Sequence, residues 1–344
     1  MTELIAYLHG RKNWTPAQIP GDKITCLNYS FAKIKGLSLG EDVPNIQKIS
    51  EIRTLYPHLK INISIGGWAA DCFSDAAVSQ RNRETFSSEI VKFIKKYNFD
   101  GVDIDWEYPG SALGGIKART EDAKNYTAFL KLLHTKLHAE TKEYILSAAI
   151  GADADLIDSL AVDGQYSYTQ YLDFINVMTY DLRGSWTNIT GHHANLYAYP
   201  QENGALSANQ AVKQLLSHHV PASKIVVGAA AYSRDWYTFD EPNTQPIIGK
   251  TAHSNGTHTT DYNDLKLILK KHPTNCHWDN NALAPYYFDG EVFMSFEDTK
   301  SIASKAEFVH QNNLGGLMLW ELSLDAESEL IYAAAETLFP TKKD

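Results

Sequence analysis

Short apolar stretches rich in β-branched residues recur along the chain, and helical patterns separate several of them. Eight stretches have this character: LIAYL (4–8), ITCLNYSFA (24–32), LKINISIGGW (59–68), FDGVDIDWE (99–107), YILSAAIGA (144–152), FINVMTYDL (174–182), KIVVGAAAY (224–232) and GGLMLWEL (315–322). Two apolar stripes have helical spacing: Phe86, Ile90, Phe93, Ile94 and Tyr97, and then Tyr126, Phe129, Leu130, Leu133 and Leu137. The pattern predicts strands that alternate with amphipathic helices.

Strands that are apolar along their whole length and separated by helices are typical of a parallel sheet covered on its outer face. Eight such units predict an α/β fold, a closed (β/α)8 barrel, whose active site lies at the carboxyl ends of the strands. A doubly wound open sheet is the alternative, but the sequence has no glycine-rich phosphate loop to support it.

The interval between the seventh and eighth apolar runs is too long for a single helix. It extends from about Tyr237 to Lys300 and contains two candidate strands, APYYF (284–288) and EVFMSF (291–296). A loop of that length inside a compact domain usually has its own structure. We therefore predict two domains: a barrel made of residues 1–236 and 301–344, and an α+β insertion over residues 237–300.

Composition narrows the range of partners. The formal charge of −10 comes without a basic patch, which argues against nucleic acid and anionic membranes. No apolar window is long enough to span a bilayer, and a strand-like run follows Met1 where a signal peptide would have its basic and apolar segments. We expect a soluble monomer. Its seven Trp and nineteen Tyr residues suit a cleft for flat, partly apolar ligands such as sugar rings.

The stretch FDGVDIDWEYPG (99–110) places four carboxyl groups inside an apolar run. Side chains alternate along a strand, so Asp103, Asp105 and Glu107 share the face that points into a barrel, whereas Asp100 has the opposite parity and a structural role. Three carboxyls spaced about 7 Å apart in a low-dielectric interior do not all ionise easily, so at least one should keep a proton near neutral pH. Glu107, nearest the mouth, is the natural proton donor.

A divalent metal site is the main rival interpretation of these carboxyls, because Mg²⁺ and Ca²⁺ prefer oxygen ligands. One short strand would supply three ligands, and the sequence has no second carboxylate cluster to supply the others. His192 and His193 could serve a metal, but paired histidines in a loop are more often solvated. The three widely spaced cysteines also suggest no metal site. We expect neither a metal nor a cofactor.

Four motifs together resemble one family. DGVDIDWE (100–107) matches the DxxDxDxE signature of the family 18 glycoside hydrolases, the chitinase family. SIGGW (64–68) is similar to the family's SxGG motif, MTYD (178–181) to its sixth-strand element, and Trp320 to its eighth-strand tryptophan. The resemblance covers essentially the whole chain, and residues 237–300 resemble the chitinase-insertion domain of the longer members.

The resemblance implies a retaining, substrate-assisted mechanism, in which the acetamido carbonyl of the substrate attacks its own anomeric carbon. Glu107 would act first as general acid and then as general base. The resemblance also implies supporting roles: Asp105 would orient the acetamido group, Tyr180 would donate its hydroxyl to the acetamido oxygen, Asp181 would hold the distorted sugar, and Asp103 and Ser64 would lie behind Asp105. Asp181 is also the candidate nucleophile of an ordinary two-carboxylate mechanism.

The other candidate residues are expected to bind sugar. Trp320 would form the apolar floor under the reacting sugar, and Trp68 and Trp186 would stack on leaving-group sugars. A further set at strand ends is expected to line the cleft: Tyr7, Phe31, Gly67, Met178, Tyr232 and Arg234.

The resemblance implies a chitinase that cleaves β-1,4 bonds between N-acetylglucosamine units, with chitin or chito-oligosaccharides as substrate. Two alternatives stay open: an endo-β-N-acetylglucosaminidase that acts on N-glycans, and a lectin-like relative that binds chitin without hydrolysing it. Lectin-like relatives lack the terminal acid of the motif, which is present here as Glu107. Chitin is extracellular, which favours an extracellular location although we find no signal peptide in the sequence.

Overall fold

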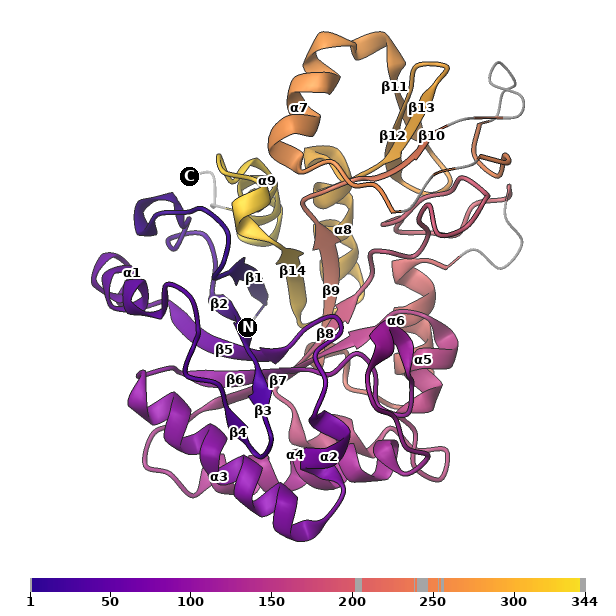
Figure 1. The fold of residues 1–344 in the computed structure, drawn as a ribbon. Coiled ribbons are helices and arrows are strands. Elements are labelled where there is room, and N and C mark those ends of the chain that lie inside the picture. The colour runs from indigo at the N-terminus through magenta and orange to yellow at the C-terminus, as the bar shows by residue number, and fades with distance from the viewer. Residues whose placement is uncertain are drawn as a thin grey trace.

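The computed structural model describes residues 2–201, 206–237, 239, 247–252, 254 and 257–340. Its centre is a closed barrel of parallel strands in the order β1-β14-β9-β8-β7-β6-β5-β2 (Figure 1). The barrel strands are β1 (Glu3–His9), β2 (Cys26–Ala32), β5 (Lys60–Gly66), β6 (Gly101–Asp105), β7 (Ile145–Gly151), β8 (Phe174–Met178), β9 (Ile225–Ala230) and β14 (Gly316–Trp320). Each predicted run coincides with one of these strands, β1 extending one residue beyond its run at either end, so the (β/α)8 prediction is confirmed.

Helices pack around the outside of the barrel (Figure 1). They are α1 (Ile49–Leu55), α2 (Phe73–Ala77), α3 (Gln80–Lys96), α4 (Asp122–His138), α5 (Ala154–Ser159), α6 (Ala208–Ser217), α8 (Thr299–Gln311) and α9 (Glu329–Leu338). The two predicted stripes lie in α3 and α4, except that Tyr97 directly follows α3, and Phe86, Ile90, Phe129 and Leu133 are fully buried. No described helix is both long and apolar enough to cross a membrane.

The two faces of β6 carry different chemistry. Trp106, just after the strand, lies on the outward face: it stacks on Phe73 of α2 with ring centroids 5.3 Å apart and meets Tyr126 of α4 edge-on. Full burial of a large apolar side chain stabilises a fold by roughly 1.5–3 kcal/mol. Because parity is fixed along a strand, this packing directs Asp103 and Asp105 into the barrel.

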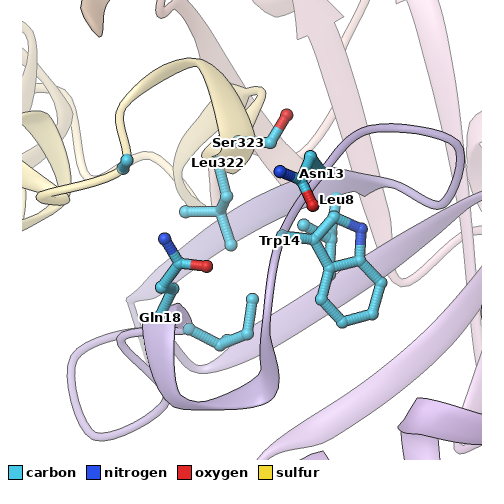
Figure 2. Close-up of a pocket in the computed structure, with 8 residues that line it drawn as sticks. Leu8, Asn13, Trp14, Gln18, Leu322 and Ser323 are labelled. Carbon is cyan, nitrogen blue, oxygen red and sulfur yellow. The ribbon is translucent and has the colours of Figure 1, made fainter.

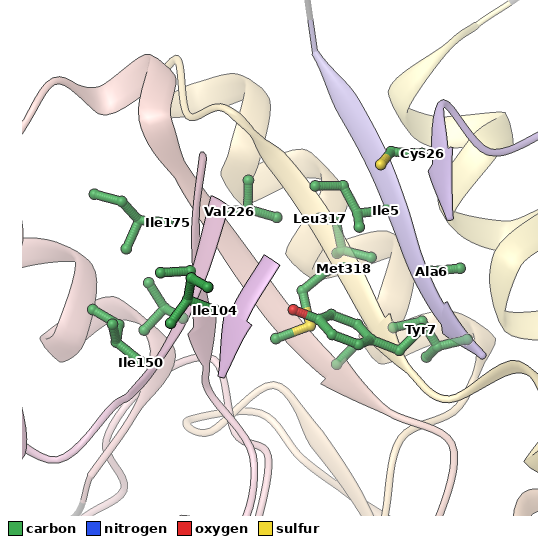
Figure 3. Packing of buried hydrophobic residues seen from close by; sticks show 14 of the residues in the cluster. Ile5, Ala6, Tyr7, Cys26, Ile104, Ile150, Ile175, Val226, Leu317 and Met318 are labelled. Atoms are coloured by element: carbon green, nitrogen blue, oxygen red, sulfur yellow. The ribbon is translucent and has the colours of Figure 1, made fainter. Parts of the chain in front are cut away.

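Apolar side chains from the barrel strands form the main core. Figure 3 shows part of it, with Ile5 and Tyr7 of β1 and Met318 of β14 among the buried side chains. The residues labelled there come from both the beginning and the end of the chain, so closure of the barrel between β1 and β14 is what completes this core.

A second, four-stranded antiparallel sheet follows β9 in the chain. Its order is β10 (Arg234–Tyr237), β13 (Val292–Ser295), β12 (Ala284–Phe288) and β11 (Cys276–Asp279), and Figure 1 shows it beside α7 (Tyr262–Lys271). The two strands predicted in this interval are confirmed as β12 and β13. Residues 238, 240–246, 253 and 255–256 of the predicted insertion lie outside the described residues, and the domain boundaries stay a prediction. A short hairpin, β3 (Ile34–Lys35) and β4 (Ser38–Leu39), follows β2.

Candidate active site

Asp103 is the deepest carboxyl of the column, and side chains from four strands anchor it. Its Oδ2 accepts hydrogen bonds from the hydroxyls of Tyr7 (2.9 Å) and Ser64 (2.7 Å), and its Oδ1 from Ser147 Oγ (2.6 Å) and Asn176 Nδ2 (3.1 Å). Burial raises the pKa of Asp103, and these four hydrogen bonds act against that shift. The carboxyl is therefore held in one orientation from β1, β5, β7 and β8.

Asp105 lies one step nearer the mouth and is 4% exposed. Burial raises its pKa well above the ordinary value, and the nearby Glu107 and Asp103 raise it further. Its Oδ1 has no hydrogen-bond partner among the described residues. A buried carboxyl oxygen without a partner is available to a donor group of a ligand.

The end of β5 approaches Asp105 through glycine. A Cβ on Gly66 would lie 1.9 Å from the carbonyl oxygen of Asp105, and the N–H of Gly67 donates to that same oxygen at 2.9 Å. A Cβ on Gly67 would also lie 2.6 Å from the ring of Phe31. Both glycines have positive φ, at 119° and 85°, so glycine meets a steric and a conformational requirement here.

Glu107 ends the column and is 9% exposed. Burial raises its pKa to about 7; the charge of Asp181 acts in the same direction, and a hydrogen bond with Tyr108 and the charge of Lys33 act against it. A carboxyl that titrates near 7 is protonated in a large fraction of molecules at neutral pH. That is the property a general acid needs.

Asp181 lies just past β8 in an ion pair with Arg234. Its Oδ1 accepts from Arg234 Nε at 2.7 Å and its Oδ2 from Nη2 at 2.6 Å, a bidentate arrangement. Burial alone would raise the pKa of Asp181, but the nearby His193 and the hydrogen bonds and charge of Arg234 hold it well below its usual range. Asp181 is therefore an ionised carboxylate with both oxygens engaged.

Two tyrosines border this ion pair. Tyr180 and Tyr232 are 9% and 7% exposed, and their rings meet edge-on with centroids 6.5 Å apart. Burial raises the pKa of both hydroxyls well above the ordinary value, so each keeps its proton and remains a hydrogen-bond donor. The guanidinium carbon of Arg234 lies 5.4 Å from the ring centroid of Tyr232 and 5.0 Å from that of Trp186.

Stacked aromatic rings form an apolar surface beside the column. Trp320 stacks on Phe31 with centroids 5.5 Å apart at 26°, and lies 5.6 Å from Tyr7. Trp68 and Trp186 are 59% and 53% exposed, which is unusual for rings of this size and typical of binding surfaces.

The predicted site residues do not all have the same surroundings. Tyr7 is only 1% exposed and donates to Asp103, so it lies behind the column, whereas Phe31, Met178 and Arg234 are partly exposed at strand ends. Asp100 accepts from the N–H of Ile61 at 2.9 Å and pairs with two cations, which confirms its structural role at the start of β6.

The expectation that His192 and His193 are solvated is wrong, because both are fully buried. Their segment packs against the second sheet: the N–H of His193 donates to Ser295 Oγ at 2.9 Å, and His192 Nε2 lies 3.2 Å from Asp279 Oδ2. His193 Nδ1 lies 3.7 Å from Asp181 Oδ1 and supports the ion pair from inside. Two adjacent histidines in an apparent loop carry no sequence pattern that predicts packing against this sheet.

Sequence reasoning also missed several residues that contact the column or lie near it. Ser147 and Asn176 are single polar residues inside otherwise apolar runs, and that interruption was the available signal. Tyr108 directly follows the acid, and Lys33 follows β2. Among the described residues, no group of three or more His, Cys, Asp or Glu side chains could hold a metal ion.

A separate small pocket lies between the loop after β1 and the short turn after β14 (Figure 2). Its lining residues are Leu8, Asn13, Trp14, Gln18, Ile19, Leu322, Ser323 and Ala326. None of these side chains titrates near neutral pH, so the pocket offers no acid or base chemistry.

Comparison with known sequences agrees with the motifs. The family profile described as "Glycosyl hydrolases family 18" matches residues 3–325. The chain is 34% identical over 306 residues to Chitinase A1 of Niallia circulans, and the aligned region covers 83% of this chain and 43% of that protein. It is 32% identical over 356 residues to Chitotriosidase-1 of Mus musculus, and this alignment covers 94% of this chain and 73% of that protein. The chain thus spans less than half the length of the bacterial relative.

Solved structures give the same result. A cell-surface-expressed, multi-modular chitinase of Paenibacillus sp. str. FPU-7 matches with a TM-score of 0.90 and 35% identity, covering 99% of this chain and 43% of that one. A family 18 N-acetylglucosaminidase of Paenibacillus barengoltzii matches with a TM-score of 0.87 and 31% identity, covering 98% of this chain and 100% of that one. Since the profile spans nearly the whole chain and these relatives exceed 30% identity, the chain belongs to family 18 of the glycosyl hydrolases.

Proposed function

We propose that the chain is a chitinase that hydrolyses β-1,4-linked N-acetylglucosamine polymers and oligomers by a retaining, substrate-assisted mechanism. The observation that carries the proposal is the state of Glu107: its carboxyl is buried at the mouth of the column, and its pKa is raised to about 7. Family membership supports the glycosidase activity, and relatives named as chitinases support the substrate class.

In the first step, Glu107 gives its proton to the glycosidic oxygen while the bond from that oxygen to the anomeric carbon breaks. The acetamido carbonyl oxygen of the same sugar bonds to the anomeric carbon from the opposite side, which gives an oxazolinium ion. Asp105 would accept a hydrogen bond from the acetamido N–H, and its unpartnered Oδ1 supports this role. The buried, protonated hydroxyl of Tyr180 would donate to the acetamido oxygen.

In the second step, the Glu107 carboxylate takes a proton from water as the water oxygen bonds to the anomeric carbon. The bond to the acetamido oxygen breaks, and the neutral acetamido group and the protonated Glu107 are restored. Two inversions at one carbon retain its configuration. Asp103 and Ser64 would act only as positioning residues, because Ser64 donates to Asp103 and both side chains are fully buried.

The environment of Asp181 favours this route over an ordinary two-carboxylate mechanism. Both of its oxygens accept hydrogen bonds from Arg234, and these bonds stabilise the anion. A carboxylate whose two oxygens both accept hydrogen bonds from a cation is a weak nucleophile. Asp181 would instead hold a hydroxyl of the distorted sugar, with Tyr232 and Arg234 keeping it in place.

The exposed and stacked aromatics would bind the sugar chain. Trp320, supported by Phe31, would form the floor under the reacting sugar, and Trp68 and Trp186 would stack on sugars of the leaving group. Gly67 and Met178 would line the wall between them. The close approach of Gly67 to Phe31 supports the first of these assignments.

The test compares purified protein and Glu107→Gln on chito-oligosaccharides and on a high-mannose glycoprotein. We expect wild-type protein to cleave the oligosaccharides. Glu107→Gln should lose at least about a thousandfold in turnover, because no proton reaches the leaving oxygen, while oligosaccharide binding persists. Glycan release without oligosaccharide cleavage would replace the chitinase proposal with the endo-β-N-acetylglucosaminidase alternative. Binding of oligosaccharides with no turnover of either substrate would indicate the lectin-like alternative.

A further inference from the structure

Lys33, in the short connection after β2, brings a cation next to the carboxylate column. Its ammonium donates to the carbonyl oxygen of Gly66 at 2.6 Å and lies 5.1 Å from the ring centroid of Phe31. Gly66 pairs in register with Asp105 across β5 and β6, and Phe31 stacks on Trp320. The amine is therefore fixed at the strand ends, where the active-site side chains meet.

The bond that fixes Lys33 leaves its charge available. Among the described residues, its hydrogen-bond partner is a neutral carbonyl, whereas Arg234 is neutralised by direct pairing with Asp181. Burial lowers the pKa of Lys33, and the charges of Asp105 and Glu107 act against that shift. The hydrogen bond to the Gly66 carbonyl and the charges of the nearby carboxyls both favour the ammonium form of Lys33.

We propose that Lys33 sets the charge state of the Asp105–Glu107 pair: its ammonium, held on the Gly66 carbonyl, stabilises the pair when one carboxyl is ionised and the other keeps its proton. That singly ionised state is the one in which an anionic Asp105 orients the acetamido group and a protonated Glu107 donates, so the inference rests on the proposed function. Lys33 is a positioning residue that acts through these carboxyls.

Other charged and titratable groups face the same pair from the surrounding elements. Asp103 lies below on β6, Tyr7 on β1, Tyr180 and Asp181 beyond β8, and Tyr108 after Glu107. Arg11 and His9 lie on the side of Lys33. Apart from Lys33 and the paired Arg234, the named groups that face the two carboxyls are acidic or uncharged. Loss of Lys33 should therefore raise the pKa of both ionisation steps of the Asp105–Glu107 pair.

The experiment replaces Lys33 by Met and by Gln, which remove the charge, and by Arg, which keeps it. Lys35→Met is the matched control, because Lys35 lies two residues along the chain on β3 and its side chain runs over Gly40. NMR titration of labelled glutamate carboxyls follows Glu107, whose signal is the one absent from Glu107→Gln. The pH dependence of kcat/KM on a chito-oligosaccharide is measured in parallel.

We expect Lys33→Met and Lys33→Gln to raise the Glu107 midpoint, and both limbs of the kcat/KM profile, by about 0.5–1 pH unit. Lys33→Arg and Lys35→Met should keep the wild-type values. Equal midpoints in Lys33→Met and Lys35→Met would overturn the inference and leave the proposed function intact. The Glu107 midpoint could instead be higher in Lys33→Met than in wild-type protein while neither wild-type protein nor any variant cleaves chito-oligosaccharides. That result would support the role of Lys33 and refute the proposed function.

Discussion

Arg234 Nε and Nη2 hold the two oxygens of Asp181 at 2.7 and 2.6 Å, in a fork that lies next to Tyr180. This relationship joins the end of β8 to the first strand of the second sheet, because Arg234 begins β10. The second sheet therefore reaches the active site through Arg234 itself. A residue at the base of an inserted segment can then determine the geometry of a barrel residue.

The first prediction concerns this fork. Arg234→Lys keeps the charge but loses the bidentate geometry and the contact with Trp186, so kcat/KM on chito-oligosaccharides should fall by about 10–100-fold. Arg81→Lys, on the exposed surface of α3, is the control and should not change kcat/KM. An unchanged rate in Arg234→Lys would show that charge alone is enough at this position.

The second prediction concerns stability as a function of pH. An unfolded glutamate titrates near pH 4.3, whereas Glu107 in the fold titrates at about 7. Its folded pKa is raised, so its contribution to stability is complete below about pH 4 and is lost as pH rises through 7. Glu107→Gln should therefore raise the free energy of unfolding by roughly 3–4 kcal/mol at pH 8 and change it little at pH 4. Urea unfolding at the two pH values measures this difference.

Equal effects of Glu107→Gln at pH 4 and pH 8 would contradict the raised pKa. Glu51→Gln, at an exposed position of α1, controls for the change in net charge. The same raised pKa predicts that kcat/KM falls as pH increases above about 7, because the general acid loses its proton.

The third prediction concerns the anchor of Asp103. Ser147→Ala removes the 2.6 Å hydrogen bond to Oδ1 and leaves a buried carboxyl with fewer donors. We expect a loss of about 1–2 kcal/mol in the free energy of unfolding and a fall of about tenfold in kcat with little change in KM. Ser159→Ala, at the exposed end of α5, is the matched control. A larger change in KM than in kcat would indicate that Asp103 contributes to substrate binding.

The carboxylate column could be predicted from sequence because two simple periodicities fix it. Eight apolar runs set the number of strands, and alternation along β6 sets which carboxyls share the interior. Neither inference needs a contact between distant residues. For the same reason, Asp100 could be separated from the other three acids by parity alone.

The anchors of the column could not be predicted, because they depend on how the barrel closes. Tyr7 and Asn176 reach Asp103 from positions 96 and 73 residues away in the chain. The burial of His193 depends on Ser295, in a sheet whose strands β10 and β11 have four residues each and little apolar pattern. Short polar strands give no periodic signal, so β10, β11 and the histidine behind Asp181 were hidden, whereas the more apolar β12 and β13 of the same sheet were predicted.

The last prediction tests the nucleophile. In a chito-oligosaccharide analogue with hydroxyl in place of the acetamido group on the cleaved sugar, the intramolecular nucleophile is absent. We expect kcat/KM to fall at least about a thousandfold. A well-oriented intramolecular group can have an effective molarity of about 10⁵ M or more, and the analogue loses this advantage. Inhibition of wild-type turnover by the analogue would show that it still binds.

Asp105→Asn sharpens that comparison, because Asp105 should matter only when an acetamido group is present. The variant should lose about 10–100-fold on the natural substrate, as a hydrogen bond to a charged group weakens, and keep the small rate of the analogue. Rapid cleavage of the analogue, abolished by Asp181→Asn, would instead make Asp181 the nucleophile. The engaged oxygens of Asp181 and the unpartnered Oδ1 of Asp105 both predict the first outcome.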